Sequence, residues 1–301
     1  MEKPGWFIRA LETPWEDRTV TVAEVPIHYL YWEAAPESDR PGLVFVHGNG
    51  AHAHWWTFLA PFFLEHYRVA ALDLSGAGDS GRRERYTPEQ FAAEVMAVAE
   101  DAGFGNDTVV VGHSFGGYIT LKTGLLYRER LAGVVLVDSA VRPPDFKWER
   151  DPRRSPIKPK RIYETFEEAL GRFRLMPPQD CKNDYLLDYI GRHSLTQIEN
   201  GWTWKFDPHM YRDFPLGKDW PEIYKDLALP SAAMFGELSH DWENITRDEI
   251  IAFMRQQRPN MPHFDLLNAH HHVLLDQPLA FASSVKQQME NWQAQGVFAR
   301  K

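Results

Sequence analysis

A chain of 301 residues, 44% of them hydrophobic, can bury the core of one large α/β domain, or of a domain that carries a sizeable insertion. Its formal net charge of -9 argues against sequence-independent binding of nucleic acid, because neutralising phosphates requires a dominant basic surface. The single cysteine, Cys181, cannot form an intramolecular disulfide, and the charged first ten residues lack the apolar stretch of a signal peptide. No apolar run approaches the ~20 residues that span a bilayer. We therefore expect a cytoplasmic protein without membrane or nucleic-acid partners.

The predicted strands begin with an antiparallel hairpin at one edge of a sheet, because residues 19–32 alternate and are β-branched or aromatic, with Pro26 near a turn. Short continuous apolar runs follow at 42–46, 67–73, 108–112, 131–138 and 229–236. Such runs are typical of parallel strands that are covered on both faces. A last strand at 263–269 brings the expected sheet to eight strands.

Helix-like segments separate these strands at 54–66, 87–103 and 116–130, and an amphipathic helix is expected at 278–295. The second helix has Thr87 as its N-cap, Pro88 at its first position and Gln90 three residues after the cap, which is the pattern of a capping box. Alternation of strand and helix implies right-handed βαβ crossovers, and hence an α/β fold with a doubly wound, mostly parallel sheet.

Residues 141–228 break this alternation and are rich in proline, aromatic residues and charge. Compact domains rarely leave a loop of that length without structure. We therefore expect a mostly helical lid inserted after the sixth strand, with the core built from residues 1–140 and 229–301.

Ser114 lies in the sequence "GHSFGG" (112–117), after a buried strand and before a helix. The pattern G-x-S-x-G in this context marks a nucleophile elbow, a strained turn that lifts the serine above the sheet and sets it at a helix N-terminus. The alternative is an ordinary glycine-rich turn. The strand before and the helix after favour the catalytic interpretation.

A serine nucleophile needs a base, and the tract 270–272 contains three histidines just past the last predicted strand, where a loop could reach the carboxyl edge of the sheet. His271 is the candidate base. Three adjacent histidines on a loop point in different directions and cannot all ligate one metal, and no carboxylate or cysteine cluster completes a site. We therefore expect no metal ion.

Five stretches together make the chain similar to the α/β-hydrolase superfamily, in its lidded single-domain branch. They are "VFVHGNG" (44–50), "ALDLSGAGDSG" (71–81), "VGHSFGG" (111–117), "VVLVDSA" (134–140) and "HHHVLLDQP" (270–278). The resemblance implies a triad in the chain order nucleophile, acid, histidine. It matches His271 with the catalytic histidine, with His270 standing where glycine is usual, so that His270 and His272 are expected to pack or to form hydrogen bonds.

The resemblance also implies an oxyanion hole formed by the backbone N–H groups of Asn49 and Phe115. Losing one such donor typically slows an enzyme about 100- to 1,000-fold. Asn49 follows His47 and Gly48 in "HGNG". His47 is a candidate substrate contact or, alternatively, a brace for this loop.

The acid departs from the commonest family pattern, which places aspartate where this chain has Ser239. Two candidates are left: Asp138, at the end of the sixth predicted strand, and Asp241, two residues beyond Ser239. Some lidded relatives, such as haloalkane dehalogenases, carry the acid at the end of that earlier strand. Asp138 is preferred, because a carboxylate at a strand end is better held to orient a histidine than one on a displaced loop.

Four further residues are candidates for substrate binding: His113, Trp55, Trp202 and Trp204. The alternative for Trp55 is a place in the core, and the alternative for the two lid tryptophans is that they hold the lid together.

These observations predict a serine hydrolase that cleaves a carboxylic ester or a related acyl compound through an acyl-enzyme, without metal or organic cofactor. Lactonase and carbon–carbon bond hydrolase activities use the same triad and stay open, as does a barely catalytic ligand receptor on the same scaffold. Haloalkane dehalogenase and epoxide hydrolase activities are disfavoured, because the chemistry of those relatives needs an aspartate nucleophile where Ser114 stands. The expected partner is a small acyl substrate, and a homodimer is left open.

Overall fold

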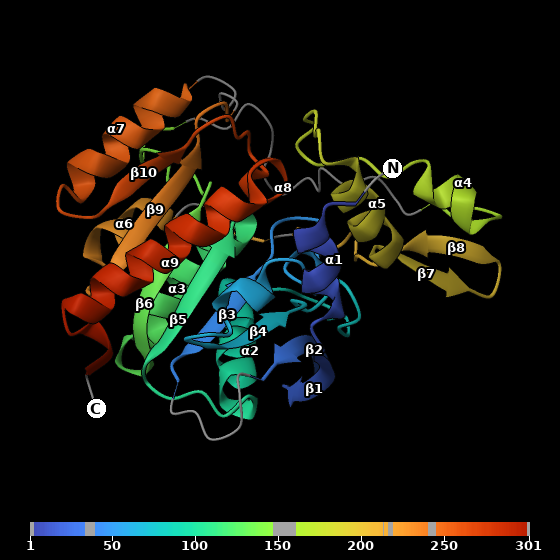
Figure 1. Cartoon of the computed structure of the whole chain (residues 1–301), viewed down its shortest axis with the longest axis horizontal. Helices are drawn as coiled ribbons and strands as arrows, with labels where there is room; N and C mark the ends of the chain where they lie inside the picture. The colour runs from blue at the N-terminus through green and yellow to red at the C-terminus, as the bar shows by residue number, and fades with distance from the viewer. Residues whose placement is uncertain are drawn as a thin grey trace.

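The structure is a computed structural model that describes residues 3–33, 40–146, 161–212, 214–215, 219–239 and 245–299. An eight-stranded sheet lies at the centre of this part of the chain, in the order β1-β2-β4-β3-β5-β6-β9-β10 (Figure 1). The strands are β1 (Glu16–Val22), β2 (Val25–Trp32), β3 (Gly42–Val46), β4 (Arg68–Leu72), β5 (Thr108–His113), β6 (Leu131–Val137), β9 (Ser231–Gly236) and β10 (His263–Leu266).

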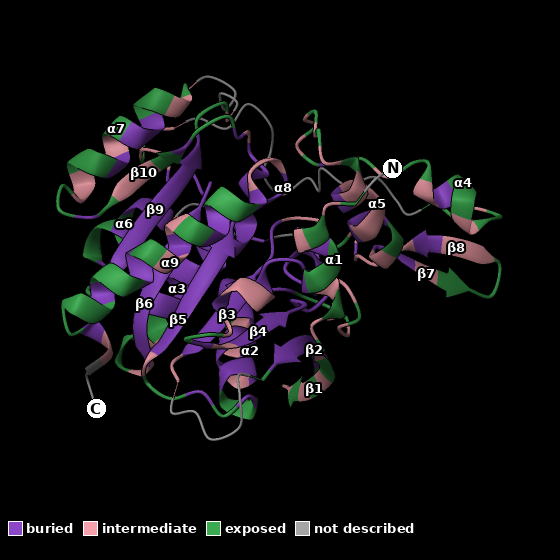
Figure 2. Cartoon of the chain, in the orientation of Figure 1, coloured by how far each residue is buried: buried purple, intermediate pink, exposed green. Residues whose placement is uncertain are grey.

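The pairing of the strands confirms the predicted α/β fold. β1 and β2 form the expected antiparallel hairpin, β2 is also antiparallel to β4, and every other pair in the sheet is parallel. All residues of β3, β5, β6 and β9 are buried, as Figure 2 shows in purple. Continuous apolar runs form these strands because helices cover the sheet on both faces.

The helices divide between the two faces of the sheet. α2 (Pro88–Asp101), α3 (Phe115–Leu126), α6 (Trp220–Asp226) and α7 (Arg247–Gln257) pack into one core, whereas α1 (Gly5–Glu12), α8 (Val273–Asp276) and α9 (Pro278–Ala294) pack into the other. The capping box predicted at Thr87 is confirmed, because its hydroxyl accepts from the Gln90 N–H while the Gln90 side chain accepts from the Thr87 N–H. Two short 3₁₀ helices, η3 (Arg128–Arg130) and η4 (Val297–Ala299), follow α3 and α9.

The helix predicted over 54–66 is wrong. Two 3₁₀ turns, η1 (Ala53–Trp55) and η2 (Ala60–Phe63), occupy this stretch instead. Pro61 has no N–H and therefore cannot continue an α-helical ladder. Residues 54–60 and Phe63 are buried, and packing against the sheet holds Trp56 and Phe58 in place.

The described part of the predicted lid contains α4 (Phe166–Leu170), α5 (Asp184–His193) and a two-stranded hairpin of β7 (Leu195–Ile198) and β8 (Gly201–Trp204), which was not predicted. It also contains α6, which packs with the core helices α2, α3 and α7. Figure 1 shows α5 beside α1, with α4 and the hairpin beyond α5, on the opposite side of the molecule from α7. His52 Nε2 joins η1 to the end of α5, at 2.9 Å from Ser194 Oγ. Within the residues that the structure describes, no helix combines the length and apolarity needed to cross a membrane.

Candidate active site

Ser114 lies in the turn that joins β5 to α3. Its φ of +54° falls in the left-handed region, which a serine adopts only when its surroundings impose it. The surrounding backbone is close, since a Cβ atom at Gly116 would lie 2.4 Å from the carbonyl oxygen of Val46. A glycine at 116 is therefore needed for α3 to start this near to β3. The strand, turn and helix expected around Ser114 are all present.

Three side chains form a continuous series of hydrogen bonds at the carboxyl ends of the central strands. Ser114 Oγ lies 2.9 Å from His271 Nε2, and His271 Nδ1 lies 2.6 Å from Asp138 Oδ2. A carboxylate can only accept, so His271 donates through Nδ1 and presents the lone pair of Nε2 to the serine hydroxyl. His271 and Asp138 are both buried. The arrangement is able to transfer a proton from the serine to the histidine.

Asp138 directly follows β6 and is held by more than the histidine. Its Oδ1 accepts from the Gly236 N–H at 3.1 Å, and its Oδ2 accepts from the Ser239 hydroxyl at 2.6 Å. Burial alone would raise the pKa of Asp138, but the hydrogen bonds from His271, Ser239 and Gly236 outweigh burial and lower the pKa below its usual range. This buried side chain is therefore a charged carboxylate at neutral pH.

Of the two candidate acids, Asp138 is the one that the structure places against His271, whereas Asp241 lies outside the described residues. Ser239 stands where the family resemblance more commonly places aspartate, and it binds the acid from that position. The sequence marked Ser239 only as a departure from the family pattern. That departure was the one available signal that the residue lies beside the triad.

The predicted oxyanion donors lie on two segments that meet at Ser114. Within the described residues, neither the Asn49 N–H nor the Phe115 N–H donates to a protein acceptor. A Cβ atom on Gly48 would lie 3.2 Å from Ser114 Cβ, so the loop after β3 passes directly beside the serine. Donors without protein acceptors beside the serine are suited to hold an oxyanion.

His47 has both ring nitrogens hydrogen-bonded to the backbone, one within this loop and one at the residues that follow β4. Its Nδ1 donates to the Gly48 carbonyl at 2.8 Å, and its Nε2 accepts from the Leu74 N–H at 3.1 Å. Burial lowers the pKa of His47 and keeps the ring neutral. The structure therefore places His47 as a brace for the oxyanion loop, which was the alternative to a substrate contact.

A narrow recess, too small in this structure to hold a water molecule, lies beside Ser114. It is lined by Gly48, Asn49, Ala51, Trp55, His113, Ser114, Met176 and His272. Two of the candidate substrate contacts, Trp55 and His113, thus line the recess beside Ser114. Met176 reaches the recess from the lid, and no feature of the sequence pointed to it.

The other two candidates lie elsewhere. Trp202 and Trp204 belong to β8, where Trp202 packs edge-on to Phe166 at 5.0 Å and Trp204 packs against Phe173 at 6.2 Å. Neither tryptophan lines the recess at Ser114. The structure places both in the internal packing of the lid.

The doubly wound sheet and the serine turn at its carboxyl edge define the class of protein. Residues 43–284 match the model of the alpha/beta hydrolase family. The chain belongs to that family, as the resemblance implied.

Curated relatives of the chain differ in activity. The chain is 34% identical over 120 residues to the dihydrolipoyllysine-residue acetyltransferase component of the acetoin cleaving system of Pseudomonas putida, covering 39% of this chain and 32% of that protein. It is 30% identical over 146 residues to pimeloyl-[acyl-carrier protein] methyl ester esterase of Aliivibrio fischeri (strain MJ11), covering 48% and 52%. It is 28% identical over 114 residues to epoxide hydrolase 4 of Mus musculus, covering 37% and 31%. The matched part spans about a third to a half of each relative.

Solved structures resemble the chain over nearly its whole length. E-2-(acetamidomethylene)succinate hydrolase superimposes with a TM-score of 0.74 at 16% identity, covering 92% of this chain and all of that one. The thioesterase domain from the curacin biosynthetic pathway superimposes with a TM-score of 0.73 at 19% identity, covering 91% and 99%. At these identities the likeness establishes the fold alone.

Proposed function

We propose that the protein is a serine hydrolase that cleaves a carboxylic ester or a related acyl compound. The unbroken hydrogen bonds from Ser114 through His271 to Asp138 carry this proposal. The esterases among the relatives support it. An epoxide hydrolase is also among them, but the alkyl-enzyme chemistry of that class needs an aspartate nucleophile, and this chain has serine at the elbow.

In the first half of the reaction, Ser114 Oγ attacks the carbonyl carbon while His271 Nε2 takes the hydroxyl proton. Asp138 stabilises the resulting imidazolium and fixes the tautomer in which Nε2 is the acceptor. Negative charge grows on the former carbonyl oxygen, and the N–H groups of Asn49 and Phe115 receive it. His271 then gives its proton to the leaving alcohol, and the acyl group stays on the serine.

In the second half, a water molecule takes the place of the alcohol. His271 Nε2 accepts a proton from this water as it attacks the acyl carbon, and the same oxyanion donors hold the second tetrahedral intermediate. Return of the proton to Ser114 Oγ expels the carboxylic acid and restores the free enzyme. The same three side chains serve both halves, so no other proton carrier is needed.

The decisive experiment measures hydrolysis of chromogenic esters of increasing acyl length by the wild type and by Ser114→Ala. We expect wild-type turnover, and a loss of about four to six orders of magnitude in the variant, because the nucleophile is removed. Equal residual activity in the two proteins would refute the mechanism.

The histidine tract supplies a matched pair of variants. His271 is buried against Ser114 and Asp138, whereas the half-exposed His270 bonds Asp276 through Nδ1 at 3.0 Å. His271→Gln is expected to abolish ester hydrolysis, while His270→Gln is expected to keep most of it. Similar losses in the two variants would mean that the tract acts through its fold and not through one base.

A further inference from the structure

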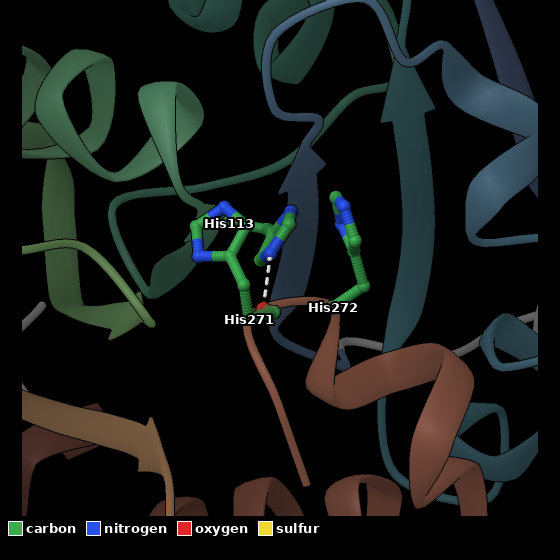
Figure 3. A group of neighbouring side chains, drawn as sticks. All are labelled: His113, His271 and His272. Atoms are coloured by element: carbon green, nitrogen blue, oxygen red, sulfur yellow. Dashed lines mark hydrogen bonds between the residues drawn. The ribbon is translucent and has the colours of Figure 1, made fainter. Parts of the chain in front are cut away.

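Three imidazole rings converge beside the nucleophile, and they come from two segments far apart in the sequence. His113 ends β5, whereas His271 and His272 precede α8. In Figure 3 the ring of His113 stands between the other two. One ring nitrogen from each lies within 4.8 Å of one from each of the others.

Hydrogen bonds fix which nitrogen of each ring is protonated. His113 Nε2 donates to the carbonyl of His271 at 2.9 Å, which Figure 3 marks with a dashed line. His271 Nδ1 donates to Asp138, and His272 Nε2 donates to the carbonyl of Pro177 at 3.2 Å. In a neutral ring the other nitrogen then carries a lone pair. The three lone pairs are on Nδ1 of His113, Nε2 of His271 and Nδ1 of His272.

This pattern matches the surroundings of histidines that bind metals. A ligating histidine almost always donates its second ring N–H to a carboxylate or a backbone carbonyl, which sets the tautomer and orients the ring. All three rings do so here. The outer shell of a three-histidine site is thus already present.

His113 supplies a separate indication that a ligand belongs here. The residue is buried, and its Nδ1 has no hydrogen-bond partner among the described residues. A Cβ atom on Gly48 would lie 3.0 Å from this nitrogen and 3.2 Å from Ser114 Cβ, so the lone pair of His113 lies close to the serine. Buried polar atoms without a partner are rare and call for an explanation such as a missing ion.

We propose that His113, His271 and His272 form an inhibitory Zn²⁺ site. Three neutral imidazoles suit Zn²⁺ and not Mg²⁺ or Ca²⁺, which prefer oxygen ligands. Zn–N bonds of about 2.0–2.1 Å keep two ligand nitrogens within about 4 Å of each other. The candidate ligand nitrogens lie within 4.8 Å of one another, so the most distant of them need to approach by about an ångström. The ion would lie beside Ser114, because His271 Nε2 is also the atom that accepts from Ser114 Oγ.

Zinc should inhibit the enzyme because one of its ligands, His271, is also the base of the reaction. This inhibitory role rests on the proposed function. Coordination takes up the lone pair of His271 Nε2, the same pair that accepts the proton of Ser114. A zinc-bound His271 therefore cannot act as the base. Removing the metal restores the hydrogen bond and the activity.

The other places where a metal could bind are less suitable. His270 turns away to Asp276, so the argument from sequence that 270–272 cannot share one metal still holds; His113 replaces His270 as the third ligand. A second group, His28, Asp73 and Asp79, also lies within ligand distance. There His28 already uses both ring nitrogens, on Asp73 and on Asp17.

The binding test uses protein without a histidine tag, stripped with a chelator and titrated with Zn²⁺ by calorimetry. We expect one ion per chain for the wild type and for His270→Gln. For His272→Gln we expect the affinity for Zn²⁺ to fall by at least about 10- to 100-fold. Removing an outer-shell partner typically costs that much, and losing a direct ligand should cost no less. Equal losses in the two variants, or no binding by the wild type, would overturn the site.

A second measurement needs no variant and so does not depend on how His272→Gln folds. Co²⁺ replaces Zn²⁺ in such sites, and a tetrahedral nitrogen-rich site gives strong visible absorption bands, whereas the aqueous ion is pale. We expect strong bands that grow to one equivalent and disappear when Zn²⁺ is added. A spectrum that stays that of the aqueous ion would also overturn the site.

The inhibition test adds Zn²⁺ to the ester assay, with Mg²⁺ as the control ion. We expect Zn²⁺ to remove activity over the concentration range in which it binds, a chelator to restore it and Mg²⁺ to have no effect. Binding without inhibition would overturn the role given to His271. An absence of ester hydrolysis in metal-free wild type would refute the proposed function instead, and the calorimetric and Co²⁺ arms would still decide the metal site.

Discussion

Replacing Asp138 with asparagine should remove most of the activity while keeping the shape of the site. At this position Oδ1 accepts from the Gly236 N–H, and Oδ2 accepts from both His271 and Ser239. Asparagine has one acceptor oxygen, and directing its amide group at Gly236 would place two donors against each other. The oxygen is therefore expected to face Gly236, and the amide group to face His271.

That orientation changes the tautomer of the base. An amide donor at the Oδ2 position requires His271 Nδ1 to accept, so that the proton moves to Nε2 and the ring can no longer take the proton of Ser114. A change of this kind costs about 10⁴ in kcat, or about 5.5 kcal/mol of transition-state stabilisation. KM for a chromogenic ester should change much less, because the substrate does not touch this residue.

The assay compares kcat and KM of Asp138→Asn with those of Asp241→Asn, the matched change at the other candidate acid. Thermal unfolding of both variants checks that each is folded. We expect Asp241→Asn to stay within a few-fold of the wild type. Near wild-type turnover in Asp138→Asn, together with loss of turnover in Asp241→Asn, would refute the assignment of the acid.

Three further predictions concern the surroundings of the triad. Ser239→Ala removes one hydrogen bond to a charged group, worth about 1.5–3 kcal/mol, so kcat should fall by at most about 10- to 100-fold; a loss equal to that of Asp138→Asn would contradict a supporting role. Met176→Ala enlarges the recess from its lid side and should raise kcat/KM for bulky acyl groups relative to acetate, as measured with a panel of esters; an unchanged ratio would count against Met176 as a limit on substrate size. Burial lowers the pKa of His52 from 6.5 to about 3. Below pH 6.5 the unfolded chain therefore binds a proton at His52 that the folded chain does not bind, so lowering the pH from 7.5 to 5 should reduce the free energy of unfolding by about 2 kcal/mol. His52→Gln should remove that share of the difference in urea unfolding free energy between the two pH values, and an unchanged difference would show that His52 is not its source.

The sheet was predictable because its signal is local and strong. Runs such as 42–46 and 131–137 contain no polar side chain, which is typical of strands covered on both faces, and the structure places β3 and β6 there. The 54–66 segment has the same apolar character, and there the prediction of a helix was wrong. Burial against the sheet and Pro61 decide its form, and hydrophobicity alone does not distinguish 3₁₀ turns from a helix.

The sequence of the lid hairpin contains one local signal. Asn200 and Gly201 are a pair typical of tight hairpin turns. In the structure the turn residues are Glu199 and Asn200, and Gly201, with a φ of +131°, begins β8 opposite Ile198. The two strands mix aliphatic, polar and aromatic residues. In the described structure they form a separate two-stranded sheet, to which Tyr163 adds one isolated bridge at Trp202. A hairpin outside the main core therefore leaves a weak pattern.

The candidate site likewise contains residues that the sequence predicted and residues that it did not. Ser114 and Asp138 follow strands whose ends the sequence marks, and His271 follows the last strand, so parallel topology alone brings them to one edge of the sheet. Ser239 lies just after the end of β9, and the sequence marked it only as a departure from the family pattern. Met176 reaches the same place from the lid, where the path of the chain depends on tertiary packing. No local pattern fixes that path.

Ser114 and Asp138 also share a backbone feature that ties the fold to the chemistry. Both have positive φ, +54° and +46°, and such positions cost about 1–3 kcal/mol each unless surrounding contacts impose them. The contacts are mutual: the Ser114 N–H donates to the carbonyl of Val137, just before the acid, and Ser139 Oγ, just after it, donates to the carbonyl of Ser114 at 2.8 Å. Gly117 makes this approach possible, since a Cβ atom there would overlap Ser139. The turn of the nucleophile and the turn of the acid therefore hold each other in place, and a change that relaxes either one should displace both from His271.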